Sequence, residues 1–130
     1  MQRYLGRHSE VFYALLRVMA GLMFAQHGAQ KILGLLGGQK VPLVSLFGLG
    51  GVIELVGGLL IALGLLTSWA AFICAGEMAV AYFMVHFPQG FWPVQNQGEL
   101  AALYCFVFLY MAARGGGRYS LDASLGTRTS

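Results

Sequence analysis

Residues 47–66 read FGLGGVIELVGGLLIALGLL and contain a single charged residue, Glu54. A helix rises about 1.5 Å per residue, so an apolar stretch of about 20 residues matches the roughly 30 Å hydrocarbon layer of a bilayer. The rest of the chain is similar: of its 130 residues, 58% are hydrophobic and only 10% are charged. A soluble domain of this length could not bury so much apolar surface. The sequence therefore predicts an integral membrane protein.

Four apolar windows have the length of a membrane span. They cover residues 11–33, 47–66, 69–87 and 97–113. Only Thr67 and Ser68 separate the second window from the third, and so short a connection makes the two helices antiparallel. We therefore predict one transmembrane domain over residues 1–130, an all-α protein folded as an antiparallel four-transmembrane-helix bundle.

The net charge of +3 comes mainly from basic residues outside the windows. Five arginines are expected on one side of the membrane: Arg3, Arg7, Arg114, Arg118 and Arg128. Lys40, in the first connection on the other side, is the exception. Because cytoplasmic segments carry an excess of Lys and Arg, we expect both ends of the chain in the cytoplasm. We expect no nucleic acid partner, since these residues form no single surface with interleaved aromatic side chains.

Several ionisable residues interrupt the windows: Arg17, Lys31, Glu54, Glu77 and Glu99. A charge near the bilayer centre costs roughly 2.5–3.5 kcal/mol on insertion scales, so such residues are expected to face one another or a polar cavity. Counting inward from the window ends places Arg17 level with Glu77, which predicts a structural ion pair. The same count places His27 level with Glu54, with Lys31 one turn further out.

Two interpretations of the outer group stay open. In the first, ion pairs only fix the register of the helices. In the second, His27, Lys31 and Glu54 line a pocket, with Glu99 and Tyr104 across from them, that holds a polar head group or passes a proton. Apolar residues would often stabilise a bundle as well as buried ion pairs do, which favours the pocket.

Metal and haem are not expected. His27 and His86 both lie toward the outer side, where two axial ligands could meet. The sequence nevertheless contains no HExxH motif, no CxxCH motif and no closely spaced Cys/His group.

Taken in order, four features make the chain resemble the DoxX family of membrane proteins. They are Arg17 early in the first window, HGAQK at residues 27–31, the acid followed by glycines in IELVGGLLIALGLLT at residues 53–67, and GGGRYSLD at residues 115–122. The resemblance covers nearly all of the chain. It implies a multi-pass protein of the inner membrane with four helices.

Relatives in this family are described as subunits of quinone-linked oxidoreductases, notably thiosulfate:quinone oxidoreductase, and as partners in thiol and oxidative-stress complexes. The resemblance thus implies a quinone as cofactor and other protein subunits as partners, with His27, Lys31 and Glu54 contacting the quinone. Whether the chain is an enzyme by itself stays open. The alternative is a non-catalytic assembly or scaffold subunit of a larger membrane complex. A small-solute or proton transporter is a third interpretation, weakened by the lack of a second inverted repeat.

Overall fold

The computed structural model describes residues 1–126, and all of the regular elements in that range are helical. Arg128, one of the arginines used to predict the orientation, lies outside the described residues. The α-helices are α1 (Gln2–Leu5), α2 (Ser9–Leu33), α3 (Leu46–Val52), α4 (Gly58–Leu63), α5 (Thr67–Ala81), α6 (Pro93–Asn96), α7 (Glu99–Arg114) and α8 (Leu121–Ser124). Two π-helices, η2 (Ile53–Gly57) and η3 (Tyr82–His86), and two 3-10 helices, η1 (Gly6–His8) and η4 (Phe87–Gln89), complete them. The predicted all-α class is confirmed.

Two continuous helical stretches within residues 1–126 are long and apolar enough to cross a membrane. One joins α3, η2 and α4 over Leu46–Leu63, with mean hydropathy 2.2, and the other joins α5, η3 and η4 over Thr67–Gln89, with mean hydropathy 1.6. Gly64 ends the first stretch with a left-handed backbone (φ 72°), a conformation that glycine adopts without steric cost. The second stretch begins three residues later, at Thr67.

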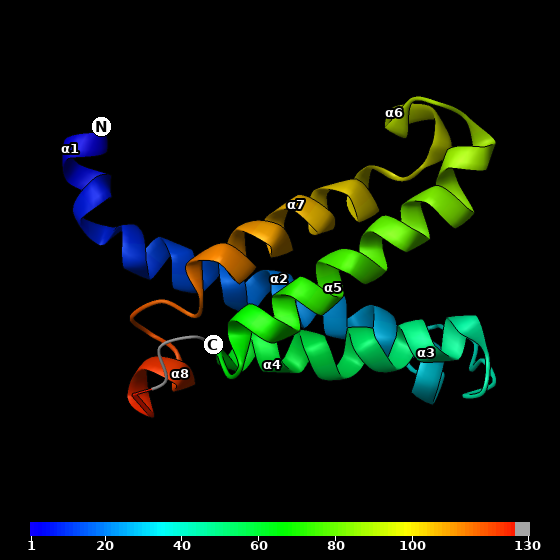
Figure 1. The fold of residues 1–130 in the computed structure, drawn as a ribbon, viewed down its shortest axis with the longest axis horizontal. Helices are drawn as coiled ribbons and strands as arrows, with labels where there is room; N and C mark the ends of the chain where they lie inside the picture. Colours follow the sequence, from blue (N-terminus) through cyan, green and yellow to red (C-terminus); the bar gives the residue numbers. More distant parts are fainter. Residues whose placement is uncertain (127–130) are drawn as a thin grey trace.

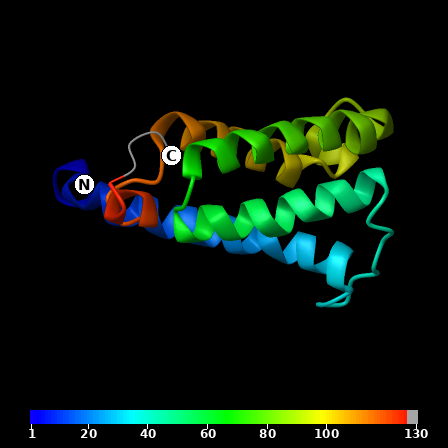
Figure 2. The same cartoon turned by 60° about the horizontal axis from the view of Figure 1, so that its bottom comes forward.

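The helices pack as two pairs, which form two layers. α2 lies along α3, η2 and α4, and α5 lies along α7. Figure 1 shows the pairs from one side, and Figure 2 shows α5 and α7 as one layer above α2 and α3–α4. In Figure 1 the helices α1 and α8 lie at one end of the molecule, while α6 and the start of α3 lie at the other. We call these the α8 end and the α6 end.

Glycines bring α2 and α4 into backbone contact. A Cβ atom added at Gly58 would lie 2.6 Å from both the Gly21 oxygen and the Ala25 nitrogen. A Cβ atom at Gly21 would lie 2.6 Å from the Gly58 oxygen and the Ala62 nitrogen. Small residues allow membrane helices to approach closely, because association in lipid depends on van der Waals packing. The glycines of residues 47–66 therefore define the α2–α4 interface.

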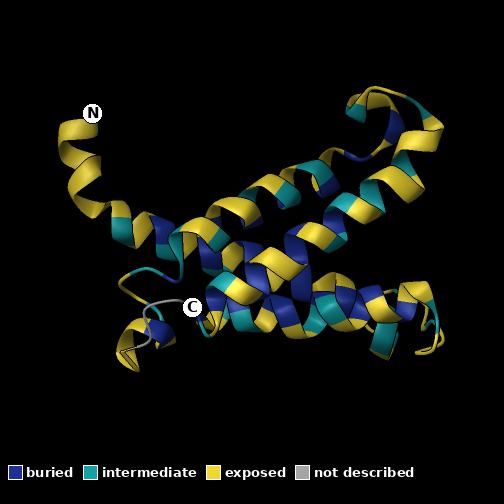
Figure 3. Cartoon of the chain, in the orientation of Figure 1, coloured by how far each residue is buried: buried dark blue, intermediate teal, exposed yellow. Residues whose placement is uncertain are grey.

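Aromatic side chains join the two layers. The ring of Phe24 on α2 lies 4.9 Å from that of Phe108 on α7, and Tyr104 stacks on Phe108 at 5.4 Å, measured between ring centroids. Figure 3 shows buried residues on the facing sides of the helices and exposed residues outside. Many of the exposed side chains are large and apolar, such as Leu15, Met19, Phe72 and Phe106. Apolar outer faces are what lipid requires of a membrane protein.

Arg17 lies at the α8 end and is 3% exposed. Its guanidinium group donates to the carbonyl oxygens of Ile61 at 2.9 Å, Gly116 at 2.8 Å and Tyr119 at 3.1 Å. The predicted Arg17–Glu77 ion pair is therefore wrong. The reason is that α2 extends past the other long helices (Figure 1). The contacts of Arg17 with Ile61 and Ala62 place it level with the end of α4, whereas Glu77 lies beside Gly50 of α3.

Candidate functional site

A cavity of about 620 Å³ lies toward the α6 end and is lined by residues of α2, α3, η2, α5, η3 and α7. Its walls are mostly apolar, with Phe24, Ile53, Ile73 and Met78 among them. The polar and ionisable side chains of the lining are His27, Lys31, Glu54, Glu77, His86, Gln97 and Tyr104. Apolar walls with a few converging polar groups are the usual composition of a small-molecule site.

Lys31 and Glu54 form an ion pair across the α2–η2 interface. The Lys31 Nζ atom donates to Glu54 Oε2 at 2.8 Å. The Glu54 side chain is 2% exposed and that of Lys31 is 32% exposed, so the ammonium group reaches the edge of the cavity while the carboxylate lies inside. Glu54 belongs to the π-helix η2, and π-helical turns are frequent at functional sites. The structure thus brings two of the predicted site residues into direct contact.

Glu77 lies in the same cavity, where the sequence did not predict it. A Cβ atom added at Gly50 would lie 3.3 Å from Glu77 Oε2 and 3.8 Å from Glu54 Oε2, so both carboxyl groups converge beside Gly50. The sequence did contain a signal for this proximity. Glu54 lies nine residues before Leu63 and Glu77 ten residues after Thr67, so the two are level when counted from their shared turn.

Three buried polar atoms of the lining have no hydrogen-bond partner within the described part of the chain: Glu54 Oε1, Glu77 Oε1 and the Tyr104 hydroxyl. Glu54 is 1% exposed and Tyr104 is 5% exposed. Burying a polar group without a partner costs about 1–3 kcal/mol, and native proteins rarely leave several together. A bound molecule or water with both donors and acceptors would satisfy them. This makes the polar part of the cavity the candidate site.

The other predicted site residues have different positions. His27 lines the cavity, and its ring lies 6.4 Å from the Tyr104 ring, measured between centroids, in a T-shaped arrangement. Tyr104 lines the cavity from α7. Glu99 is exposed at the start of α7 and lies outside the lining, so its predicted place in the pocket is wrong.

Asn96, which the sequence did not single out, organises the α6 end of the cavity. It is fully buried, and its amide donates to the Tyr82 hydroxyl at 3.1 Å and to the Gly90 carbonyl at 2.9 Å. Its backbone oxygen lies 3.1 Å from His86 Nδ1. A carbonyl oxygen only accepts, so Nδ1 carries the proton in this contact. The contact fixes the ring of His86 at the cavity wall.

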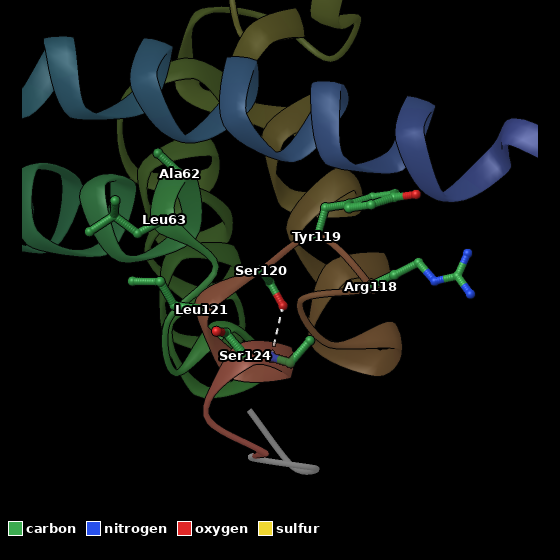
Figure 4. Close-up of a pocket in the computed structure, with 8 residues that line it drawn as sticks. Ala62, Leu63, Arg118, Tyr119, Ser120, Leu121 and Ser124 are labelled. Atoms are coloured by element: carbon green, nitrogen blue, oxygen red, sulfur yellow. Dashed lines mark hydrogen bonds between the residues drawn. The ribbon is translucent and has the colours of Figure 1, made fainter.

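A second hollow, of about 550 Å³, lies open at the α8 end, between the last turn of α4 and residues 118–124. Figure 4 shows Arg118 and Tyr119 directed away from Leu63 and Leu121, and Ser120 accepting a hydrogen bond from the backbone of residue 123. The Ser120 hydroxyl also donates to the Gly117 carbonyl at 2.7 Å. The Ser120 hydroxyl is therefore engaged in the local fold, and we assign no chemistry to this hollow.

No group of three or more His, Cys, Asp or Glu side chains that could hold a metal ion occurs in residues 1–126.

The comparisons with known proteins place the chain in a family. The family model described as DoxX matches residues 12–87, which include Lys31, Glu54 and Glu77. An uncharacterized protein of Haemophilus influenzae is 42% identical over 125 residues, covering 91% of this chain and 93% of that protein. An uncharacterized membrane protein of Mycobacterium tuberculosis is 30% identical over 135 residues, covering 88% of this chain and 82% of that protein. No solved structure matches the chain.

Proposed function

This chain belongs to the DoxX family of membrane proteins, and we propose that it is an integral inner-membrane subunit of a quinone-linked oxidoreductase or redox complex. The observation that carries this proposal is the cavity that contains both the ion pair Lys31–Glu54 and a Tyr104 hydroxyl without a hydrogen-bond partner among residues 1–126. A polar group of the ligand would lie between these residues. The apolar remainder of the cavity suits an isoprenoid tail.

The residues present fit a quinone head group. Its two carbonyl oxygens accept hydrogen bonds, and the Tyr104 hydroxyl and the Lys31 ammonium are donors. Phe24 and Ile53 supply flat and aliphatic walls for the ring. A bound quinone would supply two-electron redox chemistry. The residues of this chain orient the head group and exclude water, and we assign the supply of electrons to a partner subunit or a small reductant.

We further propose that α2, Leu46–Leu63, Thr67–Gln89 and α7 all cross the membrane as an antiparallel bundle, with the α8 end in the cytoplasm. The exposed apolar faces and the position of Arg114 and Arg118 at the α8 end support this orientation. α7 has 16 residues and spans about 24 Å, somewhat less than a roughly 30 Å layer, so the long side chains of Glu99 and Arg114 at its ends would extend to the interfaces.

The orientation is tested with single-cysteine variants of the protein, which are labelled in intact cells with a membrane-impermeant thiol reagent. These variants are made after replacement of Cys74 and Cys105 by serine or alanine. Ser9→Cys and Ser124→Cys at the α8 end should stay unlabelled until the cells are opened. Val94→Cys, which is 75% exposed at the α6 end, should label at once. Labelling of either α8-end cysteine in intact cells contradicts the orientation.

The function is tested by the binding of a radiolabelled short-chain quinone to the purified protein in mild detergent. Gly76 lines the cavity, and a Cβ atom added there would have no atom within 4 Å among the described residues. Gly76 is itself exposed, so Gly76→Phe should place a ring at the mouth of the cavity, and we expect it to weaken binding more than tenfold. The control is Leu103→Ala, a change at an exposed side chain of α7. Equal binding by wild type, Gly76→Phe and Leu103→Ala contradicts the proposal.

The alternative is a non-catalytic assembly or scaffold subunit that docks on a larger membrane complex through its outer helix faces. Purification under mild conditions distinguishes the two. Bound quinone supports the redox subunit, whereas stoichiometric partner polypeptides without quinone support the assembly subunit.

A further inference from the structure

The charges in the cavity do not balance if every carboxyl group is ionised. Lys31 supplies one positive charge and lies 2.8 Å from Glu54. Glu77 adds a second carboxyl group, and its Oε2 atom converges with that of Glu54 beside Gly50. Two carboxylates that converge in a mostly apolar cavity cannot both ionise at low cost, because each disfavours the charge of the other. The arrangement therefore needs one more positive charge or one proton.

The remaining titratable groups around Glu77 do not supply a permanent positive charge. His27 reaches the cavity from α2, His86 from η3 and Tyr104 from α7. Cys74, one turn before Glu77 on α5, is buried and lies 4.0 Å from the Ile53 carbonyl oxygen through its sulfur atom. Phenol and thiol groups carry no positive charge in either protonation state, so Tyr104 and Cys74 cannot balance a second carboxylate. Among the described lining residues, Lys31 is the side chain whose cationic group forms an ion pair with a carboxylate.

We propose that Glu54 and Glu77 hold a single proton between them and that Glu77 is the hydrogen-bond and proton donor of the cavity. Glu54 keeps its charge because Lys31 lies against it. Glu77 forms no ion pair with a cation of residues 1–126 and carries the proton. The lining then has one ammonium, one carboxylate and one carboxylic acid, and its net charge is zero with neutral histidines. This inference rests on the proposed function for the identity of the ligand, a molecule with a carbonyl oxygen.

Protonation of Glu77 also explains how an uncharged ligand would be bound. The ammonium group of Lys31 is already engaged by Glu54, so a second strong donor inside the cavity is useful. A carboxylic acid at Glu77, together with the unpartnered Tyr104 hydroxyl, supplies donors for carbonyl oxygens. If the ligand oxygen gained electrons from the partner subunit or small reductant assigned above, it would become basic enough to take the proton; the O–H bond at Glu77 would then break and one would form on the ligand. Two carboxylates then face Lys31, which favours return of a proton.

Infrared spectroscopy tests the protonation state directly. The full-length protein, labelled with ¹³C-glutamate, is reconstituted in nanodiscs, and the carbonyl stretch of protonated carboxylic acids is recorded at neutral pH. We expect the intensity of one protonated glutamic acid per chain. Glu77→Gln should abolish the band, since Glu54 stays ionised beside Lys31. Glu54→Gln should abolish it too, because Glu77 then loses its like-charged neighbour. Glu99→Gln changes an exposed carboxyl group and should leave the band unchanged.

A second measurement examines the donor role. Addition of a short-chain quinone should shift the frequency of the band, because the acid then donates to a carbonyl oxygen. A wild-type spectrum without the band contradicts the proposal that Glu54 and Glu77 share one proton. A band that persists in Glu77→Gln contradicts it as well. A band that does not shift although radiolabelled quinone binds overturns the donor role alone. A band without any quinone binding leaves the shared proton supported and refutes the proposed function, so the two failures are distinguishable.

Discussion

Arg17 and Gly116 are 99 residues apart in the sequence, yet Arg17 Nη1 donates to the Gly116 carbonyl oxygen at 2.8 Å. The same guanidinium group donates from Nε to Ile61 and from Nη2 to Tyr119. A guanidinium group has several donors in a rigid planar fork, which suits it to several carbonyl oxygens at once. One buried side chain therefore connects α2, the end of α4 and the segment before α8.

Arg17→Leu should destabilise the protein strongly. It leaves the carbonyl oxygens of Ile61, Gly116 and Tyr119 without their donor, and each buried unsatisfied group costs about 1–3 kcal/mol. We expect a lower midpoint of thermal unfolding in detergent and less protein in the membrane. Arg17→Lys keeps the charge but loses the fork, so its midpoint should lie between those of Arg17→Leu and wild type. A midpoint for Arg17→Leu equal to that of wild type would refute the role of this residue.

Gly58→Ala should separate α2 from α4. The added methyl group would meet backbone atoms of Gly21 and Ala25 at 2.6 Å, and neither can move without shifting a helix. Such overpacking costs about 1–3 kcal/mol. The matched control is Gly76→Ala on α5, where the methyl group has open space and alanine gains about 0.5–1 kcal/mol of helix stability over glycine. The midpoint of thermal unfolding should be higher for Gly76→Ala than for Gly58→Ala. The reverse order would contradict close packing of α2 against α4 at Gly58.

Acid should weaken the contact between Glu10 and the segment after α7. Glu10 lies before the first predicted span, and the backbone N–H of Arg118 donates to its Oε1 at 3.0 Å. This hydrogen bond, with Arg114 at Oε2, holds the pKa of Glu10 below its ordinary value. A lowered pKa in the folded state means that the stabilisation is present above the unfolded value, about 4.3, and is lost as the pH falls through the folded value.

The measurement for Glu10 compares the thermal midpoints of wild type and Glu10→Gln. The amide of the variant does not titrate, so the advantage of wild type should be full at neutral pH and should shrink as the pH falls below about 4. The contact is partly exposed, and we therefore expect a small difference that added salt reduces further. A constant difference from neutral pH to acid pH would show that Glu10 acts without its charge.

The helical class and the family could be predicted from the sequence because both depend on local patterns. Long apolar windows specify helices, and glycines spaced along residues 47–66 specify a face for close packing. The depth of each charge depended instead on where the helices start and how far each extends. α2 extends past its neighbours, so counting residues from the end of its window misplaced Arg17. The second and third windows were bounded at residues 66 and 69, whereas α4 ends at Leu63 and α5 begins at Thr67, and this difference separated Glu77 from Glu54 in the count.

Contacts made by irregular segments were the other part that could not be predicted. Asp122 accepts hydrogen bonds from the backbone of Leu66 at 2.8 Å and of Thr67 at 3.0 Å, and thereby satisfies N–H groups at the start of α5. The sequence motif at residues 115–122 contained Asp122 without indicating its partners. Asn96 is a similar case, since its three side-chain hydrogen bonds depend on how the segment after η4 folds back.

Glu54→Gln should impair ligand binding more than stability. The amide keeps the shape of the side chain and an oxygen that can accept from Lys31, but the negative charge is lost. Lys31 is 32% exposed, so its ammonium group can turn to water at the edge of the cavity, which limits the loss of stability. The cavity then loses the Lys31 ammonium group as a positioned donor. We therefore expect the affinity for a short-chain quinone to fall about tenfold, or about 1.4 kcal/mol.

The control for Glu54→Gln is Glu99→Gln, at the exposed start of α7, which should change neither the affinity nor the thermal midpoint. Both variants are measured at the same neutral pH in the same detergent. If Glu54→Gln instead lowers the thermal midpoint as far as Arg17→Leu does and binds quinone normally when folded, the Lys31–Glu54 pair serves to fix helix register. That result would favour the assembly subunit over the quinone site, because the cavity would then have lost its central acid without losing its ligand.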